Sequence, residues 1–275
     1  MSGPSRGVVV VTYRHADDIV ACLASLGDES RVVVVDNASD DGTAAVVAEQ
    51  FPHVELVRSP ENVGFARAVN LGIERVAPLD VLVLNPDAVV GPTTVDDLAT
   101  ALAAHPHAGM VAPRLLSPDG SVQDSVRSFK TVQTLLARRT PYGSTRRGRA
   151  VLAAHLGGTA EIDPTAGAVP VDWALGAALY VRRKAIDAVG PLDPRFFLYE
   201  EDADWCARMW AGGWQVLYAP WIVASHGYRR ESRRTWDLRH APTRHHWASI
   251  FRFLLKHPGM VLLGRSPRPV AGHHP

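Results

Sequence analysis

The first hundred residues alternate between short apolar runs and segments in which apolar residues recur at helical spacing. This alternation restricts the fold more than any other feature of the chain. Four runs have the length and composition of buried strands, namely residues 7–13, 31–39, 53–59 and 80–87. Segments with helical periodicity lie between them at 17–26, 41–51 and 65–76. This rhythm predicts an α/β fold with a doubly wound, mostly parallel sheet.

Polar residues stand at the end of each predicted strand. Ligands of doubly wound sheets bind outside the carboxyl ends of the strands, so these residues are candidates for a binding site. They are Thr12, Tyr13 and Arg14, then Asp36, Asn37 and Ser39, then Glu61 and Asn62, and finally Asn85 and Asp87. Each alone fits turn or helix-cap chemistry as well as a ligand contact. Their common position at one sheet edge favours binding, and Asp87 lies where a divalent metal could bridge it to a diphosphate.

The turn after the first strand argues against two common nucleotide-binding classes. A dinucleotide-binding dehydrogenase needs Gly-x-Gly-x-x-Gly at this place, but the turn reads TYRHADD and contains no glycine. A P-loop nucleotide hydrolase needs G-x-x-x-x-G-K-[ST], which occurs nowhere in the chain.

The remainder of the chain is less regular. We expect one globular domain with a C-terminal extension, because no internal repeat or clear linker is present. The expected elements are a helix over 93–105, a mobile loop over 138–168, a strand and a helix over 171–190, strands over 214–220 and 221–227, and a helix over 244–257.

Composition narrows the class of protein. The net charge of +1 argues against a dedicated nucleic-acid binder. The two cysteines, Cys22 and Cys206, are expected to be reduced core residues, which fits a cytoplasmic location. The N-terminal apolar run is too short for a signal peptide, and no stretch approaches the roughly 18 apolar residues of a membrane span.

The segment FFLYEEDADWCARM, residues 196–209, places four acids between apolar and aromatic residues. We expect a helix to begin here, with its first turn stabilised by the acids through the helix dipole. Asp204 lies four residues before Arg208, a spacing that suits a surface ion pair. A structural role for Asp204 and Glu200 is therefore an open alternative to a catalytic one.

The other acids of this segment point elsewhere. Asp202 projects about 160–200° away from Asp204 on a helix. Aromatic neighbours are expected to desolvate this region in part and to raise the pKa of the acid that they surround. These neighbours are Phe196, Phe197, Tyr199 and Trp205, and a core role is expected for most of them.

Taken in order, the blocks of the chain resemble family 2 glycosyltransferases, which have the GT-A fold. The first blocks are VVVVTYRHADDIVACLASL, VVVVDNASDDGT, ENVGFARAVNLGI and LVLNPDAVV. The segment from VDWALGAALYVRRKAIDAVG to WQVLYAP resembles the acceptor-side half of that family. The pattern is similar to the bacterial rhamnosyltransferase-like branch, and the likeness covers about residues 7–230.

This resemblance implies an inverting transfer of a sugar, with a nucleotide-sugar donor such as dTDP-L-rhamnose or a UDP-sugar. It implies that Asp202 is the general base and that Glu201 orients the acceptor or Asp202. The donor contacts that it implies are Thr12, Tyr13, Asp36, Asn37, Asn62, Gly64, Phe65, Asn70 and Asn85.

The resemblance also implies a bound Mg²⁺ or Mn²⁺. Asn85-Pro86-Asp87 occupies the place of the family's Asp-x-Asp motif with its first acid replaced, which leaves Asp87 as the main metal-binding carboxylate. His226, at the end of the predicted strand over 221–227, is the candidate for completing the metal site. A lone histidine at a strand end is also commonly a surface residue, so both interpretations stay open.

The C-terminal segment combines a basic stretch, residues 229–246, with an apolar helix from about Trp247. It is interpreted either as a solvated face with a core-docking helix or as contact with anions, including the headgroups at the inner face of the cell membrane. The expected division is a GT-A domain over 1–230, with halves of about 1–110 and 111–230, and a C-terminal helical extension over 231–275.

The expected acceptor is a cell-envelope glycan or a polyprenyl-diphosphate-linked glycan. Two alternatives to a transferase of this kind remain. One is a sugar nucleotidyltransferase, although such enzymes begin with a glycine-rich loop that TYRHADD lacks. The other is a catalytically silent protein that only binds nucleotide sugars, against which Asp87, Asp202 and His226 argue.

Overall fold

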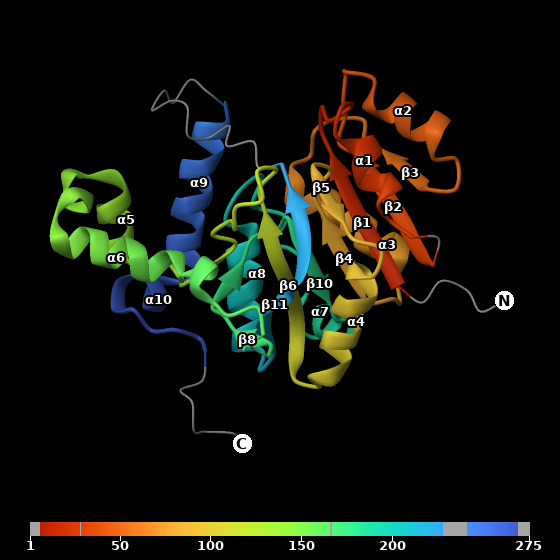
Figure 1. Ribbon diagram of the computed structural model, residues 1–275. Coiled ribbons are helices and arrows are strands. Elements are labelled where there is room, and N and C mark those ends of the chain that lie inside the picture. Colours follow the sequence, from red (N-terminus) through yellow and green to blue (C-terminus); the bar gives the residue numbers. More distant parts are fainter. Residues whose placement is uncertain (1–5, 28, 166, 228–240, 269–275) are drawn as a thin grey trace.

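The computed structural model describes residues 6–268 except 28, 166 and 228–240. A nine-stranded sheet forms its centre, with strands in the order β3-β2-β1-β4-β10-β6-β11-β5 and β8 paired to β11 (Figure 1). The strands are β1 Arg6–Thr12, β2 Ser30–Asp36, β3 Glu55–Arg58, β4 Val81–Leu84, β5 Ala88–Val90, β6 Ala108–Leu116, β8 Val169–Pro170, β10 Ala178–Val181 and β11 Gln215–His226. A second sheet pairs β7 Val126–Arg127 with β9 Trp173–Ala174.

The first four strands are parallel, as the alternation predicts. Strand β10 enters antiparallel between β4 and β6, and the β6–β11 pair is again parallel. The mainly parallel α/β sheet of the prediction is therefore confirmed, with an antiparallel strand at the junction of its two halves.

Alternate residues of the strands feed two separate cores, because successive side chains of a strand point to opposite faces of the sheet. Val9 and Val11 of β1 pack with α3 (Phe65–Val76) and α8 (Glu201–Ala211). Val8 and Val10 pack on the other face with α1 (Ile19–Ala24) and α4 (Thr94–Ala104). Helices α2 (Thr43–Gln50) and α7 (Arg183–Val189) complete the layers.

Two expectations for the second half of the chain are wrong, and one strand in the middle of the chain is missed. The expected mobile loop over 138–168 contains ordered turns of helix: the end of α5 (Val132–Arg139), 3₁₀ turns at Pro141–Ser144 and Thr159–Glu161, and α6 (Arg146–Leu156). The two strands expected over 214–227 are the single strand β11. Strand β6, in the centre of the sheet, was not anticipated. Strand β6 is buried over nearly its whole length. The segment AGMVAPRLL therefore lacks the alternation of apolar and polar residues that marks a half-buried strand in a sequence.

The C-terminal helix α9 (Ala241–Lys256), followed by α10 (Pro258–Leu263), docks on α8. Asp204 is fully buried and accepts hydrogen bonds from Arg208 at 2.9 Å, from Lys256 at 3.0 Å and from His257 at 2.8 Å. The predicted pair with Arg208 exists, but the expectation of a surface pair is wrong. Burial raises the pKa of Asp204, and His257 and Lys256 more than offset this, so its net pKa is lowered.

Two further expectations concern the ends of the molecule. The basic stretch expected over 229–246 lies outside the described residues except for its last part, in α9. Within the described part of the chain, no helix has the length and apolar character needed to cross a membrane. The division of the chain near residue 230 stays a prediction.

Candidate active site

The carboxyl ends of β1 and β2 present two buried polar groups side by side. Thr12 and Asp36 are register partners and are almost fully buried. Ser39 donates its backbone N–H to Oδ2 of Asp36 at 3.2 Å. Thr12 Oγ1 and Asp36 Oδ1 have no hydrogen-bond partner among the described residues. A buried polar atom without a partner costs roughly 1–3 kcal/mol, so a ligand with polar groups would be stabilised here.

The block after β3 forms the wall beside these two residues. Asn37 donates its amide N–H to Oδ1 of Asn62 at 2.9 Å and accepts the backbone N–H of Val63 at 2.9 Å. Asn62 Oδ1 also accepts the backbone N–H of Gly64 at 3.0 Å. The two amides therefore build the loop and fix its shape.

Gly64 allows the loop to approach the α8 side of the site. Its φ is +86°, a conformation that favours glycine, and an added Cβ would lie 2.7 Å from the carbonyl oxygen of Phe197. Phe65 donates its backbone N–H to that same oxygen at 2.7 Å. The block thus joins the β1–β2 edge to the segment that precedes α8.

Two predicted donor contacts lie differently. Tyr13 follows β1 and is exposed over 40% of its surface, with the guanidinium of Arg14 over its ring, 5.2 Å from the centroid. The side-chain amide of Asn70 donates to the backbone carbonyl of Leu192 at 2.8 Å and accepts the backbone N–H of Leu192 at 3.0 Å. These two hydrogen bonds join α3 to the loop that contains Leu192. The predicted donor contact of Asn70 stays untested.

The end of β4 and the end of β11 bring Asp87 and His226 together. His226 Nε2 lies 3.3 Å from Oδ1 of Asp87 and 3.3 Å from Nδ2 of Asn85. Both the histidine and the carboxylate are nearly buried. Burial raises the pKa of Asp87, but hydrogen bonding to His226 and the positive charges of His226 and His15 outweigh it, so the net pKa is lowered. Asp87 is therefore an anion at neutral pH.

Gln123 is a site residue that the sequence reasoning missed. Its Nε2 donates to the backbone carbonyl of His226 at 2.8 Å, and its Oε1 lies 3.0 Å from Nδ1 of that ring. The backbone carbonyl of His226 can only accept a hydrogen bond, so the NH₂ group of Gln123 faces it. The Oε1 atom of Gln123 can only accept as well, so Nδ1 of His226 must carry a proton. With Nδ1 holding a proton toward Gln123, Nε2 is the ring nitrogen that faces Asp87, where it can donate to the carboxylate or, without its proton, offer a lone pair to a cation. No motif marks Gln123, because the contact joins residues 103 positions apart.

Asp87 and His226 fit a divalent metal as two of its ligands. Carboxylate oxygen and imidazole nitrogen both bind Mn²⁺ and, with the carboxylate favoured, Mg²⁺. Among the described residues, no group of three or more His, Cys, Asp or Glu side chains is placed to hold a metal ion. The remaining coordination positions would therefore belong to substrate phosphates and water, as in many phosphate-handling Mg²⁺ sites.

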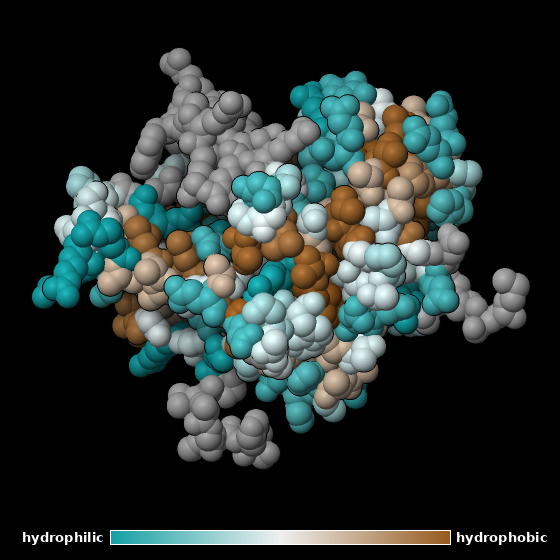
Figure 2. Space-filling model, in the orientation of Figure 1, coloured by the Kyte–Doolittle hydropathy of each residue, from teal (hydrophilic) through white to brown (hydrophobic). Residues whose placement is uncertain are grey.

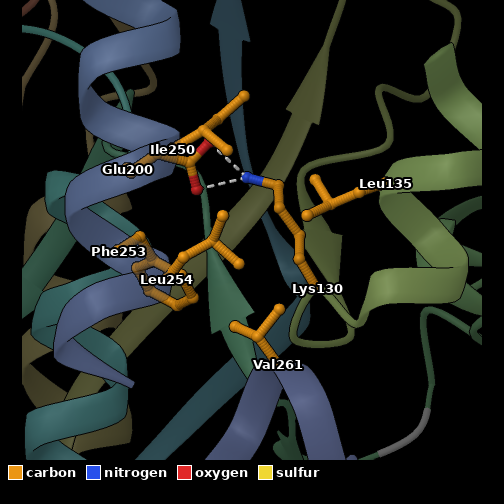
Figure 3. Close-up of a pocket in the computed structure, with 7 residues that line it drawn as sticks. All are labelled: Lys130, Leu135, Glu200, Ile250, Phe253, Leu254 and Val261. Carbon is orange, nitrogen blue, oxygen red and sulfur yellow. Dashed lines mark hydrogen bonds and ion pairs between the residues drawn. The ribbon is translucent and has the colours of Figure 1, made fainter. Parts of the chain in front are cut away.

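The N-terminus of α8 carries the buried acids. Tyr199 and Glu200 precede the helix with φ values of +71° and +66°, a conformation that is rare for residues other than glycine. Lys130 places Nζ 2.5 Å from Oε1 of Glu200 and also contacts Oε2, inside a ring of apolar side chains (Figure 3). Burial raises the pKa of Glu200, and the charge and hydrogen bonds of Lys130 lower it further than burial raises it. Glu200 is thus a buried anion paired with Lys130, which favours the structural alternative for it.

Asp202 and Glu201 make no ion pair with the residues that the structure describes. Asp202 accepts the backbone N–H of Gly176 at 3.1 Å and of Ala203 at 2.8 Å, whereas Oε2 of Glu201 has no hydrogen-bond partner among the described residues. The pKa of Asp202 is raised, mainly by burial and next by the negative charge of Glu200. The pKa of Glu201 is raised well above its usual range, mainly by burial and next by the negative charge of Asp202. The two N–H groups favour charge on Asp202, so Glu201 is the one that keeps a proton to higher pH.

One backbone segment connects this acid pair to the metal-ligand pair. Gly176 donates to Asp202, and the next residue, Ala177, accepts the backbone N–H of Asn85 at 2.9 Å. An added Cβ on Gly176 would lie 3.7 Å from Cβ of Asp202 and 3.8 Å from the ring of Phe65. The arrangement combines a carboxyl pair with raised pKa values, a candidate metal site and polar groups without partners among the described residues, which suits transfer of a group from a diphosphate to a hydroxyl.

Comparisons with known proteins point to the same chemistry. The family model for glycosyl transferase family 2 matches residues 7–156. The N-acetylglucosaminyl-diphospho-decaprenol L-rhamnosyltransferase of Mycobacterium tuberculosis is 31% identical over 236 residues, which cover 78% of this chain and 73% of the relative. The rhamnosyltransferase WbbL of Escherichia coli is 24% identical over 90% of this chain and 92% of its own.

A solved structure shares the fold. The mannosyltransferase PcManGT of Pyrobaculum calidifontis, in complex with GDP-Man and Mn²⁺, superposes with a TM-score of 0.57 at 21% sequence identity. The match covers 92% of this chain and 65% of that one, so the chain spans just under two thirds of the solved protein's length. The predicted GT-A fold is thereby confirmed.

The Lys130–Glu200 pair generates a stability prediction. Lys130→Met leaves a buried carboxylate uncompensated, which typically costs about 3–5 kcal/mol of unfolding free energy at neutral pH. In the wild type the lowered pKa of Glu200 contributes stability that is lost as pH falls through that pKa. In the variant, burial alone raises this pKa, so the deficit should shrink as pH falls. Urea unfolding between pH 5 and 8 measures the change in the deficit of the variant, and unfolding below about pH 4.5 measures the loss in the wild type.

The double variant Lys130→Met/Glu200→Gln is the matched control, because it removes both charges together. It should recover most of the lost stability, since replacing a whole buried pair is often close to neutral. A single variant as stable as the wild type at pH 7 would show that the pair contributes nothing.

Proposed function

The chain belongs to glycosyl transferase family 2, and we propose that this glycosyltransferase moves a sugar to an acceptor hydroxyl with inversion, using Asp202 as the general base. The observation that carries the proposal is the pair of backbone N–H groups, from Gly176 and Ala203, that favours the charged form of Asp202, a half-buried carboxyl group. Burial raises the pKa of the same carboxyl, which strengthens it as a base.

In the proposed step, the acceptor oxygen forms a bond to the anomeric carbon as the bond from that carbon to the diphosphate oxygen breaks. The electron pair of the broken bond leaves with the nucleoside diphosphate. The hydroxyl proton passes to a carboxylate oxygen of Asp202. Glu201, which keeps its proton to higher pH, can donate a hydrogen bond to the acceptor or to Asp202.

We propose dTDP-L-rhamnose as the donor, with other dTDP- or UDP-sugars as the alternatives. Two relatives carry rhamnosyltransferase in their names. Thr12 Oγ1 and Asp36 Oδ1 are the unpaired groups that a nucleoside would satisfy, and the exposed ring of Tyr13 can stack on a base. Asn37, Asn62 and Gly64 support this surface through the loop that they build.

We propose that Asp87 and His226 hold Mg²⁺ or Mn²⁺, with Asn85 beside them. Such a cation, when bound, neutralises negative charge on the departing diphosphate. The protein's own part is to keep Asp87 ionised and the Nε2 lone pair of His226 directed at the same point as the carboxylate. Gln123 acts on the site through the tautomer of His226.

For the acceptor we propose a cell-envelope glycan or a polyprenyl-diphosphate-linked sugar, handled on the cytoplasmic side of the membrane. The mycobacterial relative is named for a diphospho-decaprenol acceptor. A sugar nucleotidyltransferase or a silent binding protein would give different products from the same donor. Release of nucleoside diphosphate together with a glycosylated acceptor distinguishes the proposed reaction from both.

Asp202→Asn tests the base. The variant keeps the side-chain volume but cannot take up the proton, so transfer should fall by about 10²–10⁴-fold. Nucleoside diphosphate affinity should stay near that of the wild type, because Asp202 does not contact the donor edge of β1 and β2. Steady-state rates and calorimetric titration measure the two quantities. Transfer above about a tenth of the wild-type rate would assign the base elsewhere.

Asp87→Ala tests the metal site. Calorimetric titration of nucleoside diphosphate, with and without Mn²⁺, should show strong metal dependence in the wild type and little in the variant, because the anionic ligand is gone. Asp187→Ala is the control, since Asp187 is an exposed acid on α7 that pairs with Arg183. Equal metal dependence in the Asp87 variant and the wild type would remove Asp87 from the site.

Gln123→Met tests the positioning of His226. It keeps a similar volume but neither accepts from Nδ1 nor donates to the backbone carbonyl, so Mn²⁺ affinity should fall by about 10–100-fold. Binding of Mn²⁺ in the presence of nucleoside diphosphate can be followed by electron paramagnetic resonance without turnover. Gln123→Glu retains an acceptor for Nδ1–H and should recover part of the affinity. Unchanged affinity in Gln123→Met would contradict the role.

A further inference from the structure

The chain is almost neutral as a whole, yet its acids are unevenly placed. It has 29 Lys and Arg against 28 Asp and Glu, but no Asp or Glu occurs between Asp124 and Glu161 or after Asp237. The first of these acid-free segments contains α5 and α6, and the second contains α9 and α10. These helices lie together at the left of Figure 1, away from β1–β3.

The two acid-free segments pack against each other. Leu135 of α5 lies with Ile250 and Leu254 of α9 and Val261 of α10 around the Lys130–Glu200 pair (Figure 3). They therefore form one helical layer, to which arginines contribute exposed positive charge. These exposed arginines are Arg138, Arg146, Arg147, Arg149, Arg244 and Arg265.

The same layer carries the most exposed apolar side chains of the described residues. Trp247, Phe251 and Leu255 recur every four residues along α9 and are exposed over 37%, 63% and 68% of their surface. Leu262 and Leu263 of α10 are exposed over 67% and 65%. The opposite side of α9 is docked through buried Ile250 and Phe253. Hydrophobic surface is visible over this part of the molecule in Figure 2.

We propose that α9 and α10, with the arginines of the α5–α6 hairpin beside them, dock onto the surface of an anionic lipid bilayer. A helix with aromatic and leucine side chains on one face and arginines at its flanks suits the headgroup–acyl boundary. The absence of acids removes repulsion from anionic headgroups, and each basic residue near such a surface adds attraction. The apolar side chains would be transferred from water into the bilayer.

Two other partners fit less well. A nucleic acid would pair with the arginines but would leave the leucines and Phe251 in water. A second copy of this chain, in a two-fold contact, would bring the same arginine-rich surface against itself. An anionic lipid surface is the partner that fits both the exposed arginines and the exposed apolar side chains of this face. The inference stands on this face alone and does not depend on the proposed transfer reaction.

Co-sedimentation of the full chain with vesicles tests the proposal without donor or acceptor. At about 0.1 M salt the wild type should sediment with vesicles containing phosphatidylglycerol and far less with pure phosphatidylcholine. The double variant Phe251→Ser/Leu255→Ser and the double variant Arg146→Ser/Arg147→Ser should each lower the partition coefficient by about tenfold. The arginine effect should shrink at higher salt because exposed charges are screened, and the apolar effect should persist.

Leu71→Ser and Lys184→Ser are the matched controls, since they remove an exposed apolar side chain from α3 and an exposed cation from α7. Both should sediment as the wild type does. All six substituted residues are exposed, so circular dichroism should show folded variants. A wild type that remains in the supernatant, or a Phe251→Ser/Leu255→Ser variant that sediments unchanged, would overturn the proposal. Light scattering that shows this variant turning a dimer into a monomer, without vesicle binding, would assign the face to a second copy instead.

Discussion

The two backbone hydrogen bonds at residues 176–177 hold the site together. Gly176 donates to Asp202 on α8, and Ala177 accepts from Asn85 at the end of β4. Both residues directly precede β10, the antiparallel strand between β4 and β6. The insertion of that strand therefore sets the separation of Asp202, the proposed base, from the Asp87–His226 pair. A site built on strand and helix ends is held more rigidly than one carried by loops, which favours a fixed geometry for the reacting groups.

Charge compensation divides the four acids around the start of α8 into two kinds. Glu200 is neutralised by Lys130, and Asp204 by Arg208, Lys256 and His257. Among the described residues, Glu201 and Asp202 form no ion pair, so burial and neighbouring carboxylates raise their pKa values more than the charge of Lys130 and backbone N–H groups lower them. The cations that face the outer acids are Lys130, which precedes α5, Arg208 of α8 and Lys256 of α9. The inner pair is left basic because its neighbours are already compensated.

Most strands and helices of the first hundred residues could be predicted from the sequence. The elements and residues that could not be predicted have physical reasons for it. Val-rich runs such as residues 31–35 are recognisable because a parallel strand is buried on both faces. The helix at Glu201 was predicted from acids in its first turn, and the structure confirms it. Gln123 could not be found, because a tautomer-fixing contact over 103 residues leaves no local pattern. The helices over 132–156 were missed because their Arg, Gly and Thr content resembles that of a loop, and their helical state is supported by Thr131 and Thr145 side chains capping α5 and α6.

Helix α9 links the two faces on which the proposals rest. Its inner side places Lys256 on Asp204 of α8, and Ser249 donates to the carbonyl of Leu198, two residues before Glu200. Its outer side presents Phe251 and Leu255 to the surroundings. A sugar linked to a membrane lipid through a diphosphate can reach only a short distance from the headgroups. An enzyme that docks through the helix packed on α8 would hold its base within reach of such an acceptor, and one that docked through the donor edge of β1 and β2 would cover its own nucleotide site. The proposed lipid face and the proposed base are therefore compatible in a single orientation of the molecule.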